Sequence, residues 1–231
     1  LSCVTTAMWF APIGIVSLIS GHLLEAEDLK YTFKTLAIYL VTVLLGLFFH
    51  ILITTPALFY LVTRKSPLPV YATMIQPFMI ALGTASSGAA LPTSIVCLEA
   101  HGIDPRIANF VPSFGNTLNL DSNILYEAVA AIFIAQLNNI HLSIGKTILI
   151  SVIATLSSIG SVYIPVGLVS MILILNTVGL PVKDIALIIT LDWLIDRIRT
   201  AISVMGDGFA TCFIAHVVWQ QSIDDDRDSQ D

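Results

Sequence analysis

Apolar residues dominate six long stretches of the chain, and short polar connections separate these stretches. A helix needs about 20 residues to cross the hydrocarbon core of a membrane, so each stretch is long enough to span it. A single stretch of this kind also fits a buried helix of a soluble protein, but six in succession predict a polytopic helical membrane protein. The stretches cover residues 1–24, 35–63, 70–98, 107–139, 142–180 and 185–219.

Two of the stretches contain a polar interruption near their middle. "TASSGAALP" (84–92) lies within residues 70–98, and "ATLSSIGSVYIP" (154–165) lies within residues 142–180. Proline removes a backbone donor, while glycine and serine tolerate a turn. Backbone opened at membrane depth has to be buried in protein or line a wet cavity, so we expect a re-entrant helical hairpin in each stretch. A kinked spanning helix is the alternative.

The same order of elements occurs twice. After the first broken stretch comes one interrupted by "NTLNLDSN", and after the second comes one that carries "DWLIDRIRT". Ser87 and Asp121 are 34 residues apart, and so are Ser158 and Asp192. A broken segment followed by a polar or charged helix, repeated, is typical of a duplicated transporter with its site near the middle of the membrane. A chance coincidence stays open, because the two halves share little literal sequence.

Composition agrees with a membrane protein. The chain is 56% hydrophobic and only 11% charged, whereas soluble domains carry about 25% charged residues. The net charge of −6 arises largely in the tail "DDDRDSQD" (224–231), which we expect to be disordered and solvated. The basic loop "TRKSP" (63–67) predicts a cytoplasmic position, and "EAEDLK" (25–30) an external one. The chain opens without an initiator methionine, so we expect a longer protein.

Charged side chains in the last stretch share one helix face. At about 100° per residue, one narrow arc holds Asp192, Asp196, Arg199, Ser203 and Asp207. Thr200 lies at the edge of this stripe and Arg197 points away from it. Adjacent carboxylate and guanidinium groups suit a zwitterion, and the oxygen atoms of Asp207 suit a hard cation such as Na⁺. The alternative is a salt-bridge network that joins helices, above all for Asp192 and Arg197.

The interrupted stretch also carries polar groups. Asn119, Asp121 and Asn123 alternate by two, which favours an unwound turn that presents oxygen atoms to a cation. A kink sealed by water is the alternative. Glu127 lies four residues beyond Asn123 among apolar residues, and a carboxyl group removed from water binds a proton more readily. Glu127 is therefore a candidate proton carrier, or else a protonated hydrogen-bonding group of the core.

An intramembrane aspartyl protease is a different kind of protein that also uses membrane aspartates. Such an enzyme typically needs a Gly-x-Gly-Asp element. Here Asp207 follows Val204, Met205 and Gly206, so the glycine pair is absent from the sequence. We therefore expect no enzyme.

The motifs together resemble a known family. "MWFAPIGI", "YLVTVLLGL", "ALGTASSGAALP", "ILYEAVAAIFIAQLNN", "SIG" and "DWLIDRIRT" with "VMGD" are similar to the excitatory amino acid (glutamate/aspartate) transporters of the sodium:dicarboxylate symporter family. The resemblance implies an all-α membrane protein with two re-entrant helical hairpins and interrupted transmembrane helices. It implies a scaffold helix and extracellular loop at 1–34, a transport domain at 35–219 and an acidic cytoplasmic tail at 220–231.

The resemblance also implies a function. We expect Na⁺-coupled symport of an acidic amino acid such as L-glutamate or L-aspartate across the plasma membrane, by an elevator-type movement and with H⁺ and K⁺ coupling. The expected partners are the substrate, membrane lipid and two further copies in a homotrimer, without nucleic acid. A divergent member that takes a neutral amino acid, or mainly conducts anions, is the alternative.

Particular residues receive roles through the resemblance. Asp196 would hold the substrate ammonium group, and Arg199 its side-chain carboxylate. Glu127 would carry the coupled proton. The full substrate set is Ser86, Ser87, Asn123, Ile164, Pro165, Val166, Gly167, Asp196, Arg199, Thr200 and Ser203. The sodium ligands would be Gly115, Asn119, Ser203 and Asp207 at one site, Thr117, Ser158 and Ile159 at a second, and Asp121 at a third.

The chain departs from the family pattern in three places. The family sequence "NMDGT" reads "NLDSN" here, so Asn123 replaces a threonine. Ser203 stands where an asparagine normally binds the substrate α-carboxylate and lends an oxygen to sodium. The second tip reads "YIPVG" in place of "GIPQAG", with Tyr163 in place of a glycine. These changes leave the identity of the substrate open.

Overall fold

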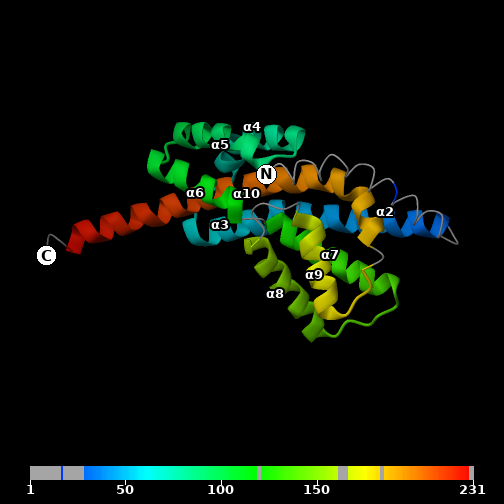
Figure 1. Ribbon diagram of the computed structural model, residues 1–231. Coiled ribbons are helices and arrows are strands. Elements are labelled where there is room, and N and C mark those ends of the chain that lie inside the picture. The colour runs from blue at the N-terminus through cyan, green and yellow to red at the C-terminus, as the bar shows by residue number, and fades with distance from the viewer. Residues whose placement is uncertain (1–16, 18–28, 119–120, 161–165, 183–184, 229–231) are drawn as a thin grey trace, which may run out of the picture.

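The regular structure of the chain is helical throughout the part that the structure describes. The computed structural model describes residue 17 and residues 29–118, 121–160, 166–182 and 185–228 (Figure 1). The all-helical class is as predicted. The helices are α2 (Leu29–Phe49), the π-helical turn η1 (His50–Thr54), α3 (Thr55–Thr63), α4 (Leu68–Thr84), α5 (Ser87–Ala100), α6 (Pro105–Leu118), α7 (Asp121–Leu137), α8 (Ile144–Gly160), α9 (Val166–Val178) and α10 (Ile185–Asp228).

Three helical segments are long and apolar enough to cross a membrane: Thr32–Thr63, Pro105–Leu137 and Leu187–Trp219. The first passes through η1, where the Tyr71 hydroxyl donates a hydrogen bond to the Ile51 carbonyl. These segments confirm the prediction of a multi-pass membrane protein. The predicted stretch 1–24 lies outside the described residues except for residue 17.

The first broken stretch is a helical hairpin. The chain turns at Ala85, whose φ of 51° is left-handed, and Ser86 then caps α5 by accepting a hydrogen bond from the Ala89 N–H at 3.3 Å. The helices α4 and α5 pack against each other on either side of this turn. A single kinked helix is therefore excluded for residues 70–98. The two helices have 17 and 14 residues, so each rises only about 21–26 Å, less than a hydrocarbon core of about 30 Å.

The second broken stretch has the same form. The helix α8 ends at Gly160 and α9 begins at Val166, and the two helices contact each other. Residues 161–165, which include Tyr163, Ile164 and Pro165, lie outside the described residues.

The last two long segments differ in continuity. One is described as two helices, α6 ending at Leu118 and α7 beginning at Asp121, and residues 119–120 between them lie outside the described residues. The helix α10 runs without a break from Ile185 to Asp228, so the interruption implied for transmembrane helices does not extend to it. It also includes residues 224–228, where a disordered tail was predicted. Extending an existing helix fixes one residue for each new hydrogen bond, which is far easier than starting a helix.

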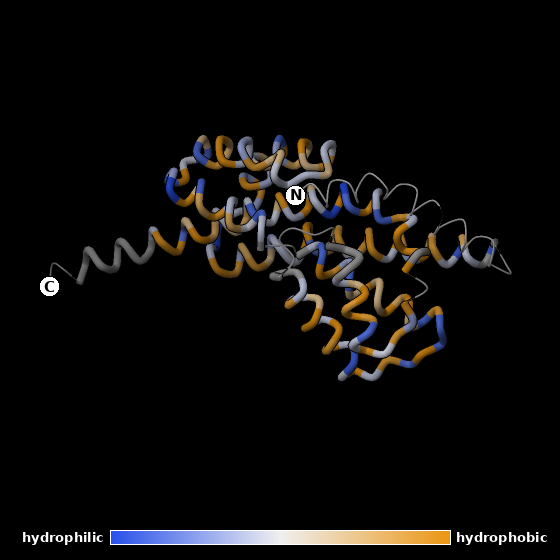
Figure 2. Tube along the Cα trace, in the orientation of Figure 1, coloured by the Kyte–Doolittle hydropathy of each residue, from blue (hydrophilic) through white to orange (hydrophobic). Residues whose placement is uncertain are grey.

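The helix α10 organises the molecule. It contacts α2, α3, α4, α5, α6 and α7, while the α8–α9 hairpin packs against α7. In Figure 1 the two hairpins lie on opposite sides of α2 and α10. Figure 2 shows polar residues gathered at the α5–α6 and α7–α8 connections, and mostly apolar helices between them. A hairpin followed by a long segment occurs twice in this order, which agrees with the predicted repeat.

A glycine sets the close packing of α10 on α4. A Cβ atom added at Gly208 would overlap the fully buried Met74 side chain, with its Sδ only 2.8 Å away. We expect Gly208→Ala to destabilise the solubilised full-length protein by about 1–3 kcal/mol, seen as a lower melting temperature. Gly145→Ala is the matched control, because its nearest neighbouring atom is 3.9 Å away. Equal melting temperatures for the two variants would show that Met74 moves aside without cost.

Candidate functional site

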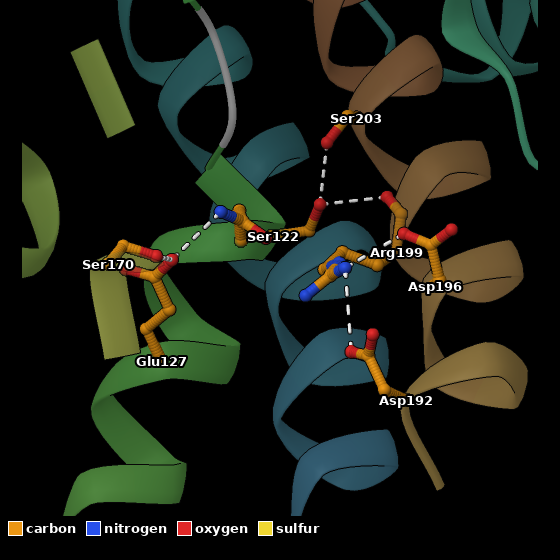
Figure 3. Close-up of polar contacts among 8 residues, drawn as sticks. Ser122, Glu127, Ser170, Asp192, Asp196, Arg199 and Ser203 are labelled. Carbon is orange, nitrogen blue, oxygen red and sulfur yellow. Dashed lines mark hydrogen bonds and ion pairs between the residues drawn. The ribbon is translucent and has the colours of Figure 1, made fainter. Parts of the chain in front are cut away.

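The polar stripe of α10 is centred on a buried arginine. Nη2 of Arg199 lies 2.8 Å from Oδ1 of Asp196 and 3.8 Å from Oδ1 of Asp192 (Figure 3). The guanidinium carbon lies 4.5 Å from the centroid of the Tyr126 ring on α7. Arg199 is 8% exposed, whereas the carboxylate side chains of Asp196 and Asp192 are 40% and 36% exposed. The arginine is therefore fixed between α10 and α7, with its acidic partners open to a ligand.

One edge of this guanidinium has no partner. Nη1 of Arg199 is buried and makes no hydrogen bond within the described residues. A buried donor without an acceptor is costly, and a guanidinium suits a carboxylate through two parallel N–H groups. A carboxylate that reached Nη1 would satisfy this donor, and the partly exposed Asp196 carboxylate suits a cationic group.

A serine on α7 joins this helix to the stripe of α10. The hydroxyl of Ser122 donates to the carbonyl of Arg199 at 2.7 Å and lies 2.5 Å from the hydroxyl of Ser203 (Figure 3). Ser122 and Ser203 are both buried, at 0% and 7% exposure. Ser122 was not among the predicted site residues, although the sequence has this serine in place of the glycine in the family pattern "NMDGT".

Two polar side chains hold Glu127, the predicted proton carrier, in place. Glu127 is fully buried, and its Oε1 accepts hydrogen bonds from the Asn123 amide at 3.1 Å and from the Ser170 hydroxyl of α9 (Figure 3). Its Oε2 is buried without a hydrogen-bond partner in the described part of the chain. Asn123, expected at the substrate, thus contacts Glu127. Ser170 was missed, because one hydroxyl in an apolar helix gives no periodic signal.

The predicted sodium ligands Gly115 and Asp207 meet. A Cβ atom added at Gly115 would lie 2.5 Å from Oδ1 of Asp207, so this carboxylate lies directly against α6. Next to Gly115, the side-chain oxygen of Asn116 is buried without a hydrogen-bond partner among the residues described. Carboxylate and amide oxygen atoms without nitrogen or sulfur ligands suit a hard cation. The donor set fits Na⁺.

Other predicted ligands are only partly described. The Thr117 hydroxyl donates to the carbonyls of Phe114 and Ser113, at 2.9 and 3.3 Å, near the end of α6. Ser158 and Ile159 lie in the last turn of α8, which α6 contacts. The positions whose side chains lie outside the description are Asn119, Asp121, Ser158, Ile159, Ile164, Pro165, Val166 and Gly167.

The first hairpin turn approaches α10 through a different arginine. Arg197, expected to point away from the stripe, donates from Nη1 to the Gly83 carbonyl at 3.0 Å. Ser86 and Ser87 lie at this turn, and the Ser86 hydroxyl is used to cap α5. Among the hydrogen bonds of the described residues, none joins Ser86 or Ser87 to Arg199. Thr200 is half-buried beside the stripe.

Residues 1–217 match the sodium:dicarboxylate symporter family. The chain belongs to this family. It is 50% identical over 218 residues to an excitatory amino acid transporter of Caenorhabditis elegans, and 49% identical over 218 residues to one of Onchocerca volvulus. It is 47% identical over 216 residues to excitatory amino acid transporter 1 of Homo sapiens.

These alignments cover 94%, 94% and 93% of the chain but only 43%, 44% and 40% of the three relatives. The chain therefore spans about two fifths of the length of the relatives it matches. Membership in a family of symporters rules out the protease alternative.

A substitution at Gly115 tests whether the Asp207 carboxylate beside it belongs to a sodium site. Gly115→Ala places a methyl group where the Asp207 carboxylate lies, so that the carboxylate has to move. We expect the Na⁺ concentration for half-maximal uptake by the full-length protein to rise about tenfold or more, which corresponds to about 1.4 kcal/mol. Gly83→Ala is the control, since no atom lies within 4 Å of its added Cβ. Equal sodium dependence in both variants would place the ion elsewhere.

Proposed function

We propose that the chain is part of a longer symporter that carries an acidic amino acid, such as L-glutamate or L-aspartate, together with Na⁺ across the plasma membrane. The observation that supports this most strongly is the buried Arg199, with Nη1 unpartnered within the described residues and Nη2 held by Asp196. A fixed guanidinium of this kind selects a carboxylate over a neutral side chain.

The substrate would lie between the α10 stripe and the two hairpin turns. The side-chain carboxylate of the substrate would bind Arg199, and its ammonium group would bind the partly exposed carboxylate of Asp196. Thr200, Ser86, Ser87 and residues 164–167 would close the site around it. Binding both charged ends in fixed positions gives specificity, because an unpaired charge in such a site is costly.

Sodium would bind beside the substrate as the driving ion. Asp207, the Gly115 backbone and Asn119 would form one site, Thr117 with Ser158 and Ile159 a second, and Asp121 a third. The close approach of Asp207 to Gly115 supports the first of these. Glu127, buried against Asn123 and Ser170, would carry a proton, and the cycle would also be coupled to K⁺.

The helix lengths support two re-entrant hairpins. The α4–α5 and α8–α9 pairs consist of helices of 13–17 residues, shorter than the roughly 20 residues of a typical membrane-spanning helix. Residues 35–219 would form a transport domain that moves as an elevator against a scaffold, to which residues 1–34 belong, with the acidic tail 220–231 in the cytoplasm. The full-length protein would assemble as a homotrimer surrounded by lipid.

The test is uptake of radiolabelled aspartate and glutamate by the full-length protein in proteoliposomes, with and without a sodium gradient. We expect uptake only with sodium. An absence of sodium-dependent uptake of either acid would refute the proposal.

A second candidate is a divergent symporter with a neutral amino acid as substrate or with mainly an anion conductance. The contact between Ser122 and Ser203 favours it, because both residues depart from the family pattern at the stripe. Substrate-gated current without matching uptake, or uptake of alanine or serine in preference to aspartate, would identify it.

A further inference from the structure

We propose that Ser122 makes Ser203 an acceptor-only oxygen, and so reserves this position of the α10 stripe for a cation or an ammonium group rather than for a carboxylate. This inference rests on the proposed function, because it assigns a role within the same site. It makes Ser122 a positioning residue that acts through Ser203.

The hydrogen atoms of the two hydroxyl groups can be placed from the distances. The oxygen of Ser122 lies 2.7 Å from the carbonyl oxygen of Arg199 and 2.5 Å from the oxygen of Ser203. A carbonyl only accepts, so the hydroxyl hydrogen of Ser122 has to point at Arg199. The contact with Ser203 is then a hydrogen bond only if Ser203 donates and Ser122 accepts. Both hydroxyl hydrogens are thus used between α7 and α10.

The consequence concerns what Ser203 can bind. With its hydrogen donated to Ser122, the oxygen of Ser203 presents only lone pairs to its surroundings. A carboxylate is also only an acceptor when ionised, so the two would repel. A sodium ion or an ammonium group is attracted instead. Asp207 lies one turn further along the same face of α10, and its carboxylate adds negative charge for the same cation.

Ser122 is the residue that creates this state. In the family pattern "NMDGT" the equivalent position is a glycine, which has no side chain to accept the hydrogen. Without Ser122 the Ser203 hydroxyl is free to rotate, and it can donate to a substrate carboxylate as well as to its own helix. Ser122 is 0% exposed, so bulk solvent does not compete for its hydrogen bonds.

The test uses the full-length protein with Ser122→Ala, Ser122→Thr, Ser203→Ala and the double variant with alanine at both positions. We expect Ser122→Ala to raise the Na⁺ concentration for half-maximal aspartate uptake about tenfold, as for the loss of one bond to a charged group. The aspartate concentration for half-maximal uptake at saturating Na⁺ should stay the same or fall. Ser122→Thr keeps the hydroxyl and should keep the wild-type sodium dependence.

The double variant separates this role from a merely structural one. If Ser122 acts through Ser203, then Ser122→Ala has no further effect on sodium dependence once Ser203 is alanine. The inference would be overturned if Ser122→Ala changed the sodium dependence equally with serine and with alanine at position 203. Equal losses of sodium and aspartate affinity in Ser122→Ala would also overturn it.

Sodium-dependent stabilisation of the purified protein against heating provides a readout that needs no transport. Ser122→Ala should reduce this stabilisation at a given Na⁺ concentration, and an unchanged stabilisation would also overturn the inference. The proposed function alone would be refuted by a different result: sodium stabilises the wild type more than Ser122→Ala, but the wild type takes up no acidic amino acid.

Discussion

Replacing Arg199 with cysteine should abolish uptake of glutamate and aspartate and leave, or create, uptake of small neutral amino acids. The guanidinium is fixed by Asp196, Asp192 and Tyr126, and its Nη1 is the edge without a partner among the described residues. Each hydrogen bond to a charged group contributes about 1.5–3 kcal/mol, so losing two of them lowers affinity more than a hundredfold. Competition for uptake between aspartate and alanine measures the change.

Two further arginine variants control for charge and position. Arg199→Lys keeps the positive charge but not the planar fork, and it should recover only a small part of aspartate uptake. Arg197→Cys removes an arginine two residues away that bonds to Gly83 instead, and it should retain the preference for acidic over neutral substrates. Undiminished aspartate uptake by Arg199→Cys would show that another group binds the carboxylate.

Replacing Glu127 with glutamine should flatten the pH dependence of net uptake while leaving exchange of internal for external substrate intact. Glutamine has the shape of glutamate, and its carbonyl oxygen can still accept hydrogen bonds from Asn123 and Ser170. It cannot gain or lose a proton, so a transport cycle that needs this proton loses its dependence on pH. Net uptake and exchange are measured side by side across the neutral pH range.

The matched control is Glu99→Gln. Glu99 is exposed and accepts a hydrogen bond from Asn109, away from the stripe. Its substitution should leave the pH profile of the wild type in place. If Glu127→Gln also keeps that profile, Glu127 is a hydrogen-bonding group of the core and the proton binds elsewhere.

Patterns among residues close in sequence predicted the features that lie within a single helix or a single turn. The spacing of Asp192, Asp196 and Arg199 at 100° per residue predicted a shared face, and the ion pairs lie on it. The polar interruption at 84–92 predicted the turn that the structure has at Ala85 and Ser86, although Gly88 and Pro92 themselves lie within α5. Both features depend on neighbours in sequence.

The contacts that complete the site could not be predicted in this way. Ser122 meets Ser203 across 81 residues, and Ser170 meets Glu127 across 43 residues. No local pattern records which helices lie side by side. Asn123 shows a different limit: α7 begins at Asp121, so Asn123 and Glu127 share a helix and are four residues apart. An alternation by two suggested an unwound turn there, although the spacing of four already favoured a pair.

The helix α7 touches two different partners within little more than one turn. Ser122 bonds to α10, and Glu127 bonds to α9. A proton on Glu127 and a ligand on α10 would therefore act on the same helix, and their binding free energies would be linked reciprocally. By whatever factor protonation changes the affinity for the ligand, the ligand changes the affinity for the proton by the same factor. Measuring the ligand affinity at two values of pH therefore also determines by how much the bound ligand changes the affinity for the proton.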